Sequence, residues 1–196
     1  DWRHFDVLCD GSFYCHLDLG VLGRHNAMNA LAVAATSWVM KIPGEAVSKG
    51  VEAFHGAGRR MEFKGTYHGA QVYDDYAHHP DELRATLEAI RSMGDHRLVL
   101  AFQPHTYTRT KLLMDDFIRE LKKADVVVLA EIYAARESNT IGISSADLAA
   151  QIPGSIYCET LQDVTETLRK IVKEGDIVVT MGAGDIFRAG EALLAE

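Results

Sequence analysis

Polar side chains that can do acid–base or anion-binding chemistry follow four apolar runs of the chain, at the point where each run ends. The first two polar segments are Asp74–Pro80 and Gln103–Thr110, and the last two are Glu131–Arg136 and Gly182–Asp185. Histidine exchanges a proton near neutral pH, and arginine binds carboxylate or phosphate through a two-bond fork. In an open parallel sheet, ligands bind outside the carboxyl ends of the strands. The four segments therefore predict one polar cleft at a single edge of a sheet.

The histidines of these segments, His78, His79 and His105, occur together with Asp74 and Asp75 and raise the question of a metal site. Divalent metals use His and Asp ligands, but the spacing here matches neither HxxxH nor HExxH. Hydrogen bonding to a polar substrate is the favoured interpretation, and a helix cap by His79 is the purely structural alternative. We therefore expect no metal site in this group.

Arginine stands at two places where it could hold an anion. Arg59 and Arg60 follow a Gly-rich turn and precede a strand. This pair is either a solvated edge or a fork for phosphate. Arg109 begins an expected helix, where a positive charge opposes the helix dipole. A charge at this unfavourable position, with no evident stabilising contact, indicates that Arg109 faces a ligand.

Two further segments begin helices with residues suited to nucleotide binding. Met181–Asp185 looks like half of a dinucleotide fingerprint, with Phe187 where the third glycine would fall. Its glycines either make a tight turn or let a ligand or backbone approach and expose helix N–H groups to an anion. Asn26 is either a helix N-cap or, with His25 and Asn29, part of a surface for a flat purine ring. The phosphate-cradling motif GxxxxGK[ST] does not occur in the sequence.

The elements that must position these residues follow from hydrophobic periodicity. Strands are expected at residues 12–18, 61–66, 71–75, 98–102, 126–130, 155–158 and 176–181. Helices are expected at residues 26–40, 45–54, 80–91, 109–122, 161–172 and 185–195, with a further short helix opened by Ser144. The patterns Ser144-x-x-Asp147 and Thr160-x-x-Asp163 resemble capping boxes, with Asp in place of Glu, at the starts of the short helix and of the helix at 161–172. Apolar strands that alternate with amphipathic helices predict an α/β, Rossmann-like domain over residues 56–196. Its mostly parallel sheet should carry helices on both faces.

Residues 1–55 form a separate part, with two expected helices and a strand or two. We expect this part to be too small for a core of its own. In its first helix, Leu31, Ala35 and Trp38 recur at spacings of four and three, which predicts that they form the buried stripe. His55–Gly58 is the expected domain boundary.

The overall composition restricts the function classes. The 196 residues include 20 Lys and Arg against 28 Asp and Glu, a formal net charge of −8. Such a balance argues against a nucleic-acid partner, which would need a basic face. No apolar run approaches the roughly 20 residues that span a bilayer. The three cysteines form no CxxC pair, which is typical of a reduced, cytoplasmic protein. We expect a cytoplasmic protein that binds neither nucleic acid nor membrane.

Several motifs, in this order along the chain, together resemble the Mur ligases. They are GRHNAMNA at Gly23–Ala30, FHGAGRR at Phe54–Arg60, DDYAHHP at Asp74–Pro80, FQPHTYTRT at Phe102–Thr110 and GAGDI at Gly182–Ile186. The fourth is the most specific of them. The resemblance implies that residues 1–55 are a remnant of the central, ATP-binding domain and that residues 56–196 are the Rossmann-like C-terminal domain. The chain would then be a fragment of a three-domain enzyme.

The resemblance also implies an activity. The enzyme would be an ATP-dependent ligase of peptidoglycan precursor synthesis, and hence of cell-wall biogenesis, cell shape and cell division. It would join L-alanine to UDP-N-acetylmuramate through an acyl phosphate, with ATP and Mg²⁺ as cofactors. The phosphate-binding loop and the Mg²⁺ ligands are expected outside this chain, so the fragment alone would be inactive.

Site residues are carried over from the resemblance position by position. Those assigned to ATP, from adenine to ribose to phosphates, are His25, Asn26, Asn29, Asp75 and Arg60. Those that line the site where the muramoyl carboxylate meets L-alanine are Tyr76, His78, His105 and Arg109. The catalytic residues among them would be His78, His105 and Arg109. The sequence departs at Thr106, where some relatives carry Arg, so one anion contact is either missing or supplied elsewhere.

Two other functions are compatible with the sequence. One is a sibling Mur ligase that recycles a tripeptide onto UDP-N-acetylmuramate, whose loop for the amino acid should differ from Gln103–Arg109. The other is a non-catalytic nucleotide-binding module, which the missing phosphate-binding loop favours for this chain taken alone.

Overall fold

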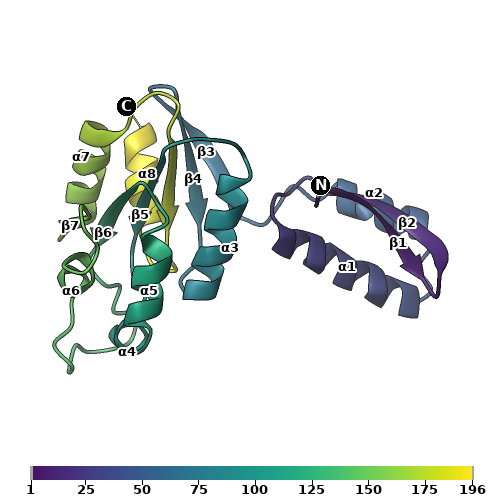
Figure 1. Ribbon diagram of the computed structural model, residues 1–196, viewed down its shortest axis with the longest axis horizontal. Coiled ribbons are helices and arrows are strands. Elements are labelled where there is room, and N and C mark those ends of the chain that lie inside the picture. The colour runs from purple at the N-terminus through teal and green to yellow at the C-terminus, as the bar shows by residue number, and fades with distance from the viewer. Residues whose placement is uncertain (1, 196) are drawn as a thin grey trace. The chain divides into compact units, whose positions relative to one another are not determined.

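The computed structural model describes residues 2–195, which divide into two compact units (Figure 1). The first unit consists of the residues up to Ala57 together with Glu88–Ser92, and the second of Gly58–Leu87 and the residues from Met93 onward. Within this described range, no helix is long and apolar enough to cross a membrane. That the first unit is a remnant of an ATP-binding domain stays a prediction.

The first unit is built from two strands and two helices. Strands β1 (His4–Cys9) and β2 (Ser12–Asp18) pair antiparallel, and helices α1 (Arg24–Val39) and α2 (Gly44–Glu52) follow them. The side chains that these elements bury together are Val7, Cys15, Leu17, Leu19, Ala27, Ala30, Ala34 and Val47. The expectation that this part lacks a core is therefore wrong. The paired strands and the small side chains of α1 together enclose a small one.

The buried face of α1 is not the predicted one. Ala27, Ala30, Ala34 and Ser37 are its buried residues, whereas Leu31 is 40% exposed and Trp38 44% exposed. The small side chains let the helix backbone approach its neighbours closely. An Ala-rich helix carries two stripes of residues with similar spacing, and periodicity does not show which of them is buried. The prediction therefore placed the stripe with the larger side chains in the interior.

The second unit contains a sheet of six strands in the order β3-β4-β8-β5-β6-β7. Their bounds are Glu62–Tyr67 for β3, Ala70–Asp75 for β4, Leu98–Phe102 for β5, Val126–Ala130 for β6, Ile156–Cys158 for β7 and Ile177–Met181 for β8. Only β3 runs antiparallel to its neighbour, and the remaining pairs are parallel. The predicted strands of this unit are confirmed to within one residue at each end.

Helices cover both faces of this sheet (Figure 1), as predicted. On one face, Val99 and Ala101 of β5 share a buried cluster with residues of α7 (Leu161–Ile171) and α8 (Phe187–Leu194). On the other face, the ring of Phe102 lies 5.6 Å from that of Phe117 in α5 (Met114–Leu121). Because successive strand residues point to opposite faces, the continuous apolar run of β5 serves both layers.

The remaining helices agree with the pattern to within two residues at each end, except at one place. Helix α3 (Pro80–Arg91) has the predicted bounds, and the short α6 (Ser145–Ala149) begins with the predicted capping box at Ser144. The helix predicted over residues 109–122 is instead two helices, α4 (Tyr107–Leu112) and α5. The break is at Leu113, whose φ of −108° and ψ of 22° are not helical. Polar and apolar periodicity continues across the break and does not signal it.

The topology brings the four polar segments to one edge. Strand β8 lies between β4 and β5, with Asp75 paired to Met181 and Met181 to Phe102. β6 runs parallel to β5. The carboxyl ends of β4, β8, β5 and β6 therefore lie at the same edge of the sheet, and the segment Phe102–Thr110 leaves a central strand there.

Candidate functional site

Aromatic and imidazole rings from two of the four segments meet at this edge. The His78 ring centroid lies 5.8 Å from that of His105 and 5.4 Å from that of Tyr76. Nδ1 of His78 is 3.0 Å from the carbonyl oxygen of Tyr76, which accepts a hydrogen bond from it when Nδ1 carries the proton. These three predicted site residues are close enough for one small substrate to touch all of them.

Two buried polar atoms at this edge have no hydrogen-bond partner within the described residues. They are Nδ1 of His105 and Nη1 of Arg109. Leaving such a group unpaired costs about 1–3 kcal/mol, and more for a charged one. Unpaired atoms of this kind in a cluster of ionisable residues are typical of a ligand-binding site. The geometry suits a carboxylate or phosphate oxygen, because a guanidinium nitrogen donates to either.

The environment of His105 keeps its imidazole neutral. Burial lowers the pKa of His105, and the positive charges of Arg109 and His78 lower it further, while Glu137 acts in the opposite direction. The imidazole pKa therefore lies below its usual value of about 6.5. At pH 7 this ring is uncharged and can accept a proton.

Glu137 holds the loop that carries His105 and Arg109. Its carboxylate accepts hydrogen bonds from the backbone N–H of Thr108, at 2.9 Å, and from the Thr108 hydroxyl. These hydrogen bonds, together with those from Tyr107 and Thr106, lower the pKa of Glu137. Glu137 therefore stays charged and fixes the beginning of α4, on which Arg109 lies.

Thr106 adopts a backbone conformation that β-branched residues rarely take, with φ of 69° and ψ of 142°. Two contacts fix it: its N–H donates to the Tyr133 carbonyl at 2.9 Å, and its own carbonyl accepts from the Thr110 hydroxyl at 2.7 Å. Such strain costs about 1–3 kcal/mol and is concentrated at functional sites.

We predict that Thr106→Gly raises the free energy of unfolding by about 1 kcal/mol, because the relief of strain exceeds the loss of one exposed hydroxyl hydrogen bond. Urea unfolding of the chain measures this change. Thr108→Gly is the control at a neighbouring position, in α4. It should lower stability by about 1 kcal/mol, because it removes the hydroxyl that donates to Glu137 and places a glycine in a helix. A loss of stability in Thr106→Gly would mean that the loop is not strained.

The glycine turn after β8 packs against the loop after β5. A Cβ at Gly184 would lie 2.3 Å from Oε1 of Gln103 and 2.7 Å from Cγ of Tyr133. Oε1 of Gln103 accepts from the N–H groups of Asp185, at 2.9 Å, and Ile186, at 3.1 Å. Of the alternatives left open for this turn, close backbone approach is therefore confirmed. An anion on these N–H groups is not supported, because Gln103 already occupies them.

The guanidinium of Arg59 is engaged by other residues of the fold. The hypothesis that Arg59 and Arg60 together bind a phosphate is therefore wrong for Arg59. Its Nε donates to the buried Asp74 at 2.7 Å, and Nη1 and Nη2 donate to the carbonyls of Gly184, at 3.2 Å, and Gly182, at 2.8 Å. Its guanidinium carbon also lies 5.0 Å from the centre of the Tyr76 ring. These contacts tie the ends of β4 and β8 together.

Arg60 and Asp75, both assigned to ATP by the resemblance, have different surroundings. Arg60 is exposed, with its guanidinium carbon 5.7 Å from the centre of the Tyr76 ring. The carboxylate of Asp75 is buried and accepts from the N–H groups of Met61, at 2.9 Å, and Ala77, at 2.8 Å. Burial raises the pKa of Asp75, and these hydrogen bonds offset the shift only in part. Asp75 shapes the loop after β4, and its contact with a ribose stays a prediction.

His25, Asn26 and Asn29 lie in the first two turns of α1, in the first unit. Gly23 is the N-cap of α1, so the alternative that Asn26 caps the helix is wrong. The Asn26 amide donates to the Leu22 carbonyl at 2.7 Å, and the Asn29 amide donates to Oδ1 of Asn26 at 3.5 Å. His25 and Asn29 are exposed. Their contact with adenine stays a prediction.

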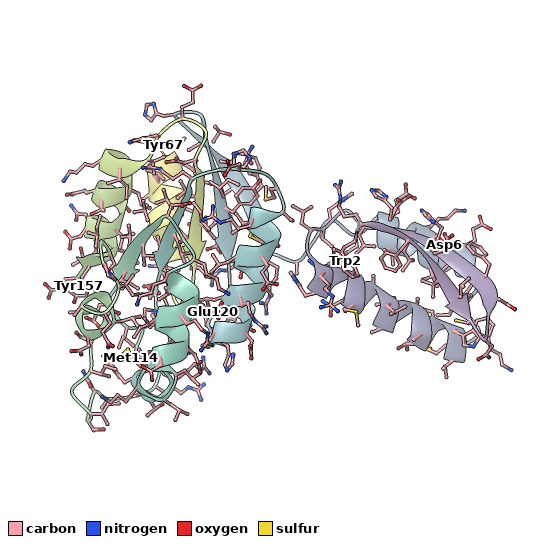
Figure 2. All side chains as sticks on the ribbon, viewed as in Figure 1. Trp2, Asp6, Tyr67, Met114, Glu120 and Tyr157 are labelled. Atoms are coloured by element: carbon pink, nitrogen blue, oxygen red, sulfur yellow. The ribbon has the colours of Figure 1, made fainter. Side chains whose placement is uncertain are left out.

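Among residues 2–195, no three His, Cys, Asp or Glu side chains are arranged to hold a metal ion. Glu131, which begins the segment after β6, accepts from the N–H of Ile132 at 2.7 Å and from the hydroxyl of Tyr157 at 2.6 Å. Tyr157 is labelled in Figure 2. The Glu131 carboxylate is thus engaged within the fold.

Sequence reasoning missed three residues of this edge: Arg59 as a clamp, Gln103 as the partner of the glycine turn, and Tyr133 as a neighbour of His105. The ring of Tyr133 stacks on that of His105, with centroids 5.7 Å apart and planes at 18°. Each of these residues acts on a partner more than 25 positions away in the sequence. No local pattern signals such a contact.

Comparison with known proteins gives a family. The model of the "Mur ligase, glutamate ligase domain" family matches residues 59–184. The UDP-N-acetylmuramate–L-alanine ligase of Lachnospira eligens is 46% identical over 194 residues, which are 97% of this chain and 42% of that protein. The ligase of the same name from Clostridium tetani is 42% identical over 195 residues. The chain thus spans less than half the length of these relatives.

Comparison with solved structures gives the same similarity. The UDP-N-acetylmuramate-alanine ligase of Thermotoga maritima superimposes with a TM-score of 0.79 at 28% identity, over 94% of this chain and 40% of that one. A murein peptide ligase from Psychrobacter arcticus shares the fold, with a TM-score of 0.72 at 24% identity, over 99% of this chain and 42% of that one.

Proposed function

Because this chain belongs to the Mur ligase family, we propose that it is part of an ATP-dependent ligase that joins L-alanine to UDP-N-acetylmuramate. The observation that carries the proposal is the pair of unpartnered buried atoms, Nδ1 of His105 and Nη1 of Arg109, beside His78 and Tyr76. The names of relatives at 46% and 42% identity supply the substrates.

The reaction has two steps. ATP, when bound, supplies the phosphoryl group that converts the muramoyl carboxylate into an acyl phosphate. The amine of L-alanine then attacks the acyl carbon, phosphate leaves, and an amide remains. An amino acid is an ammonium ion at neutral pH, so a proton must be removed before its nitrogen can attack. The protein therefore has to hold an anion and accept a proton at the same edge.

His105 is suited to accept that proton. Its lowered pKa leaves the imidazole uncharged at pH 7, and its Nδ1 is buried without a hydrogen-bond partner among the described residues. Arg109 is suited to the anionic part. A guanidinium held beside the imidazole pairs with the alanine carboxylate, or with the negative charge that develops on the acyl phosphate. His78, held by the Tyr76 carbonyl, completes the polar lining.

The ATP-binding residues are proposed from the family pattern. His25, Asn26 and Asn29 would contact the adenine, Asp75 the ribose and Arg60 the phosphates. From the same family pattern, Mg²⁺ would be held by parts of the full-length ligase outside this chain. We place the enzyme in peptidoglycan precursor synthesis in the cytoplasm, where its nucleotide substrates occur.

Ligation by the full-length protein tests the proposal. We expect ATP-dependent formation of UDP-N-acetylmuramoyl-L-alanine, with release of ADP and phosphate, and no product from the 196-residue chain alone. Thermal-shift titrations with ATP and with UDP-N-acetylmuramate, on both the chain and the full-length protein, give the binding measurement.

Each of the two alternative functions predicts a different result in the ligation experiment. A preference for a tripeptide over L-alanine would identify a recycling ligase instead. Nucleotide binding without turnover by the full-length protein would identify a binding module.

A further inference from the structure

Tyr133 pairs with the loop that carries His105. It follows β6 by three residues, and its N–H donates to the Pro104 carbonyl at 2.9 Å. Its own carbonyl accepts from the N–H of Thr106, also at 2.9 Å. Together these bonds form an isolated parallel bridge between His105 and Tyr133 beyond the ends of β5 and β6. The backbone on both sides of His105 is therefore held by Tyr133.

The ring of Tyr133 also holds the imidazole. The two rings are stacked, with planes at 18°. A Cβ at Gly184 would lie 2.8 Å from Cβ and 2.7 Å from Cγ of Tyr133, so this side chain packs directly against the glycine turn. A ring that contacts backbone on that side has little freedom to move toward it.

His105 and His78 are oriented in different ways. Nδ1 of His78 is bonded to the Tyr76 carbonyl. Nδ1 of His105 is buried and has no partner among residues 2–195. The orientation of a functional histidine is usually fixed by a hydrogen bond at its second nitrogen. At His105 the ring stacked on the imidazole, that of Tyr133, takes this part.

We propose that Tyr133 is the positioning residue of His105: its backbone fixes the loop and its ring holds the imidazole toward His78 and Arg109. The consequence for ligation rests on the proposed function, because only there does the orientation of His105 matter. The orientation itself can be measured without any activity.

Nuclear magnetic resonance of the unsubstituted 196-residue chain gives the first test. We expect nuclear Overhauser contacts between the ring protons of Tyr133 and those of His105. Their absence would overturn the proposal, and this result does not depend on whether any variant folds.

Titration of His105 in two variants gives the second test. Tyr133→Phe keeps the stacked ring, so the His105 pKa should stay below its usual value, where burial, Arg109 and His78 hold it against Glu137. Tyr133→Leu exposes the imidazole to water, so its pKa should rise toward about 6.5. Tyr133→Met replaces the leucine variant if that one unfolds.

Tyr67→Leu is the matched control. It removes a tyrosine from another tyrosine–histidine pair of the same unit, whose rings lie 4.3 Å apart, and should leave His105 unchanged. An unchanged His105 titration in Tyr133→Leu would overturn the proposal.

Kinetics of the full-length ligase separate this proposal from the proposed function. Tyr133→Leu should lower kcat at least tenfold with little change in the KM for ATP, because a misplaced base slows the reaction more than it weakens nucleotide binding. Tyr133→Phe should stay within twofold of the wild type. If Tyr133→Leu shifts the His105 titration but His105→Ala ligates normally, the positioning stands and the role of His105 as base fails. If kcat does not change in Tyr133→Leu although His105→Ala is inactive, the positioning proposal fails.

Discussion

Replacing Arg109 by alanine is expected to lower kcat/KM of the full-length ligase at least tenfold, an effect of about 1.4 kcal/mol or more on the transition state. The reason is the unpartnered Nη1, which stands ready for an anionic group of the substrate. The unfolding midpoint should hardly move, because this nitrogen makes no hydrogen bond that the fold would lose. Steady-state ligation at varied L-alanine and urea unfolding are the two measurements.

Two variants sharpen this prediction. Arg109→Lys keeps the charge but loses the planar fork, and should fall between the wild type and the alanine variant. Lys111→Ala removes an exposed charge from the same short helix and should leave kcat/KM within twofold. A loss of stability in Arg109→Ala that matches its loss of activity would make Arg109 a structural residue.

Replacing Arg97 by alanine is expected to lower the free energy of unfolding by about 3 kcal/mol, at the lower end of the range for breaking a buried ion pair because Arg97 is one-third exposed. Arg97 directly precedes β5 and Asp176 directly precedes β8. Nε and Nη2 of Arg97 donate to the two carboxylate oxygens of Asp176 at 2.9 and 2.7 Å. Nη2 also donates to the Ile171 carbonyl at 2.6 Å. Without Arg97, the buried Asp176 charge loses its partner.

Urea unfolding measures this loss, and Arg84→Ala is its control. Arg84 pairs with Asp81 at 2.9 Å on the exposed surface of α3, so its removal should cost less than about 1 kcal/mol. An equal effect of the two substitutions would contradict the assignment of the Arg97 pair as a major stabilising contact.

The two predictions concern opposite ends of the same strands. Arg97 and Asp176 precede β5 and β8, whereas His105 and the glycine turn follow them. The ion pair of Arg97 and Asp176 before the strands serves stability. The loops after the strands keep unpartnered polar atoms and a strained residue, Thr106, and serve binding.

Local patterns predicted most elements of the second unit. The capping boxes at Ser144 and Thr160 and the bounds of β5 and β6 depend on residues within a few positions of one another. Their hydrogen bonds and side-chain periodicity are local, so the sequence displays them directly. Alternation of strands and helices then restricts the sheet to a mostly parallel arrangement.

The sequence predictions failed where two alternative structures give the same residue pattern along the chain. On α1, two stripes of similar spacing could face inward, and contact with the strands selected the alanines. At Leu113, the periodicity of one long helix and of two short ones is the same. Distinguishing such cases requires the neighbouring elements, which impose the packing that local propensity leaves open.

The sequence by itself therefore determined the α/β class, the strands of the second unit, and the four polar segments that end at one edge, because these follow from periodicity and from the direction of parallel strands. The tertiary structure alone decided which polar groups are free for a ligand. Arg59 and Gln103 are occupied by the glycine turn 123 and 82 residues away, whereas Arg109 and His105 keep unpaired atoms. A side chain's hydrogen bonds depend on what lies within about 3 Å of it, and that is fixed by the fold rather than by the chain's neighbours in sequence.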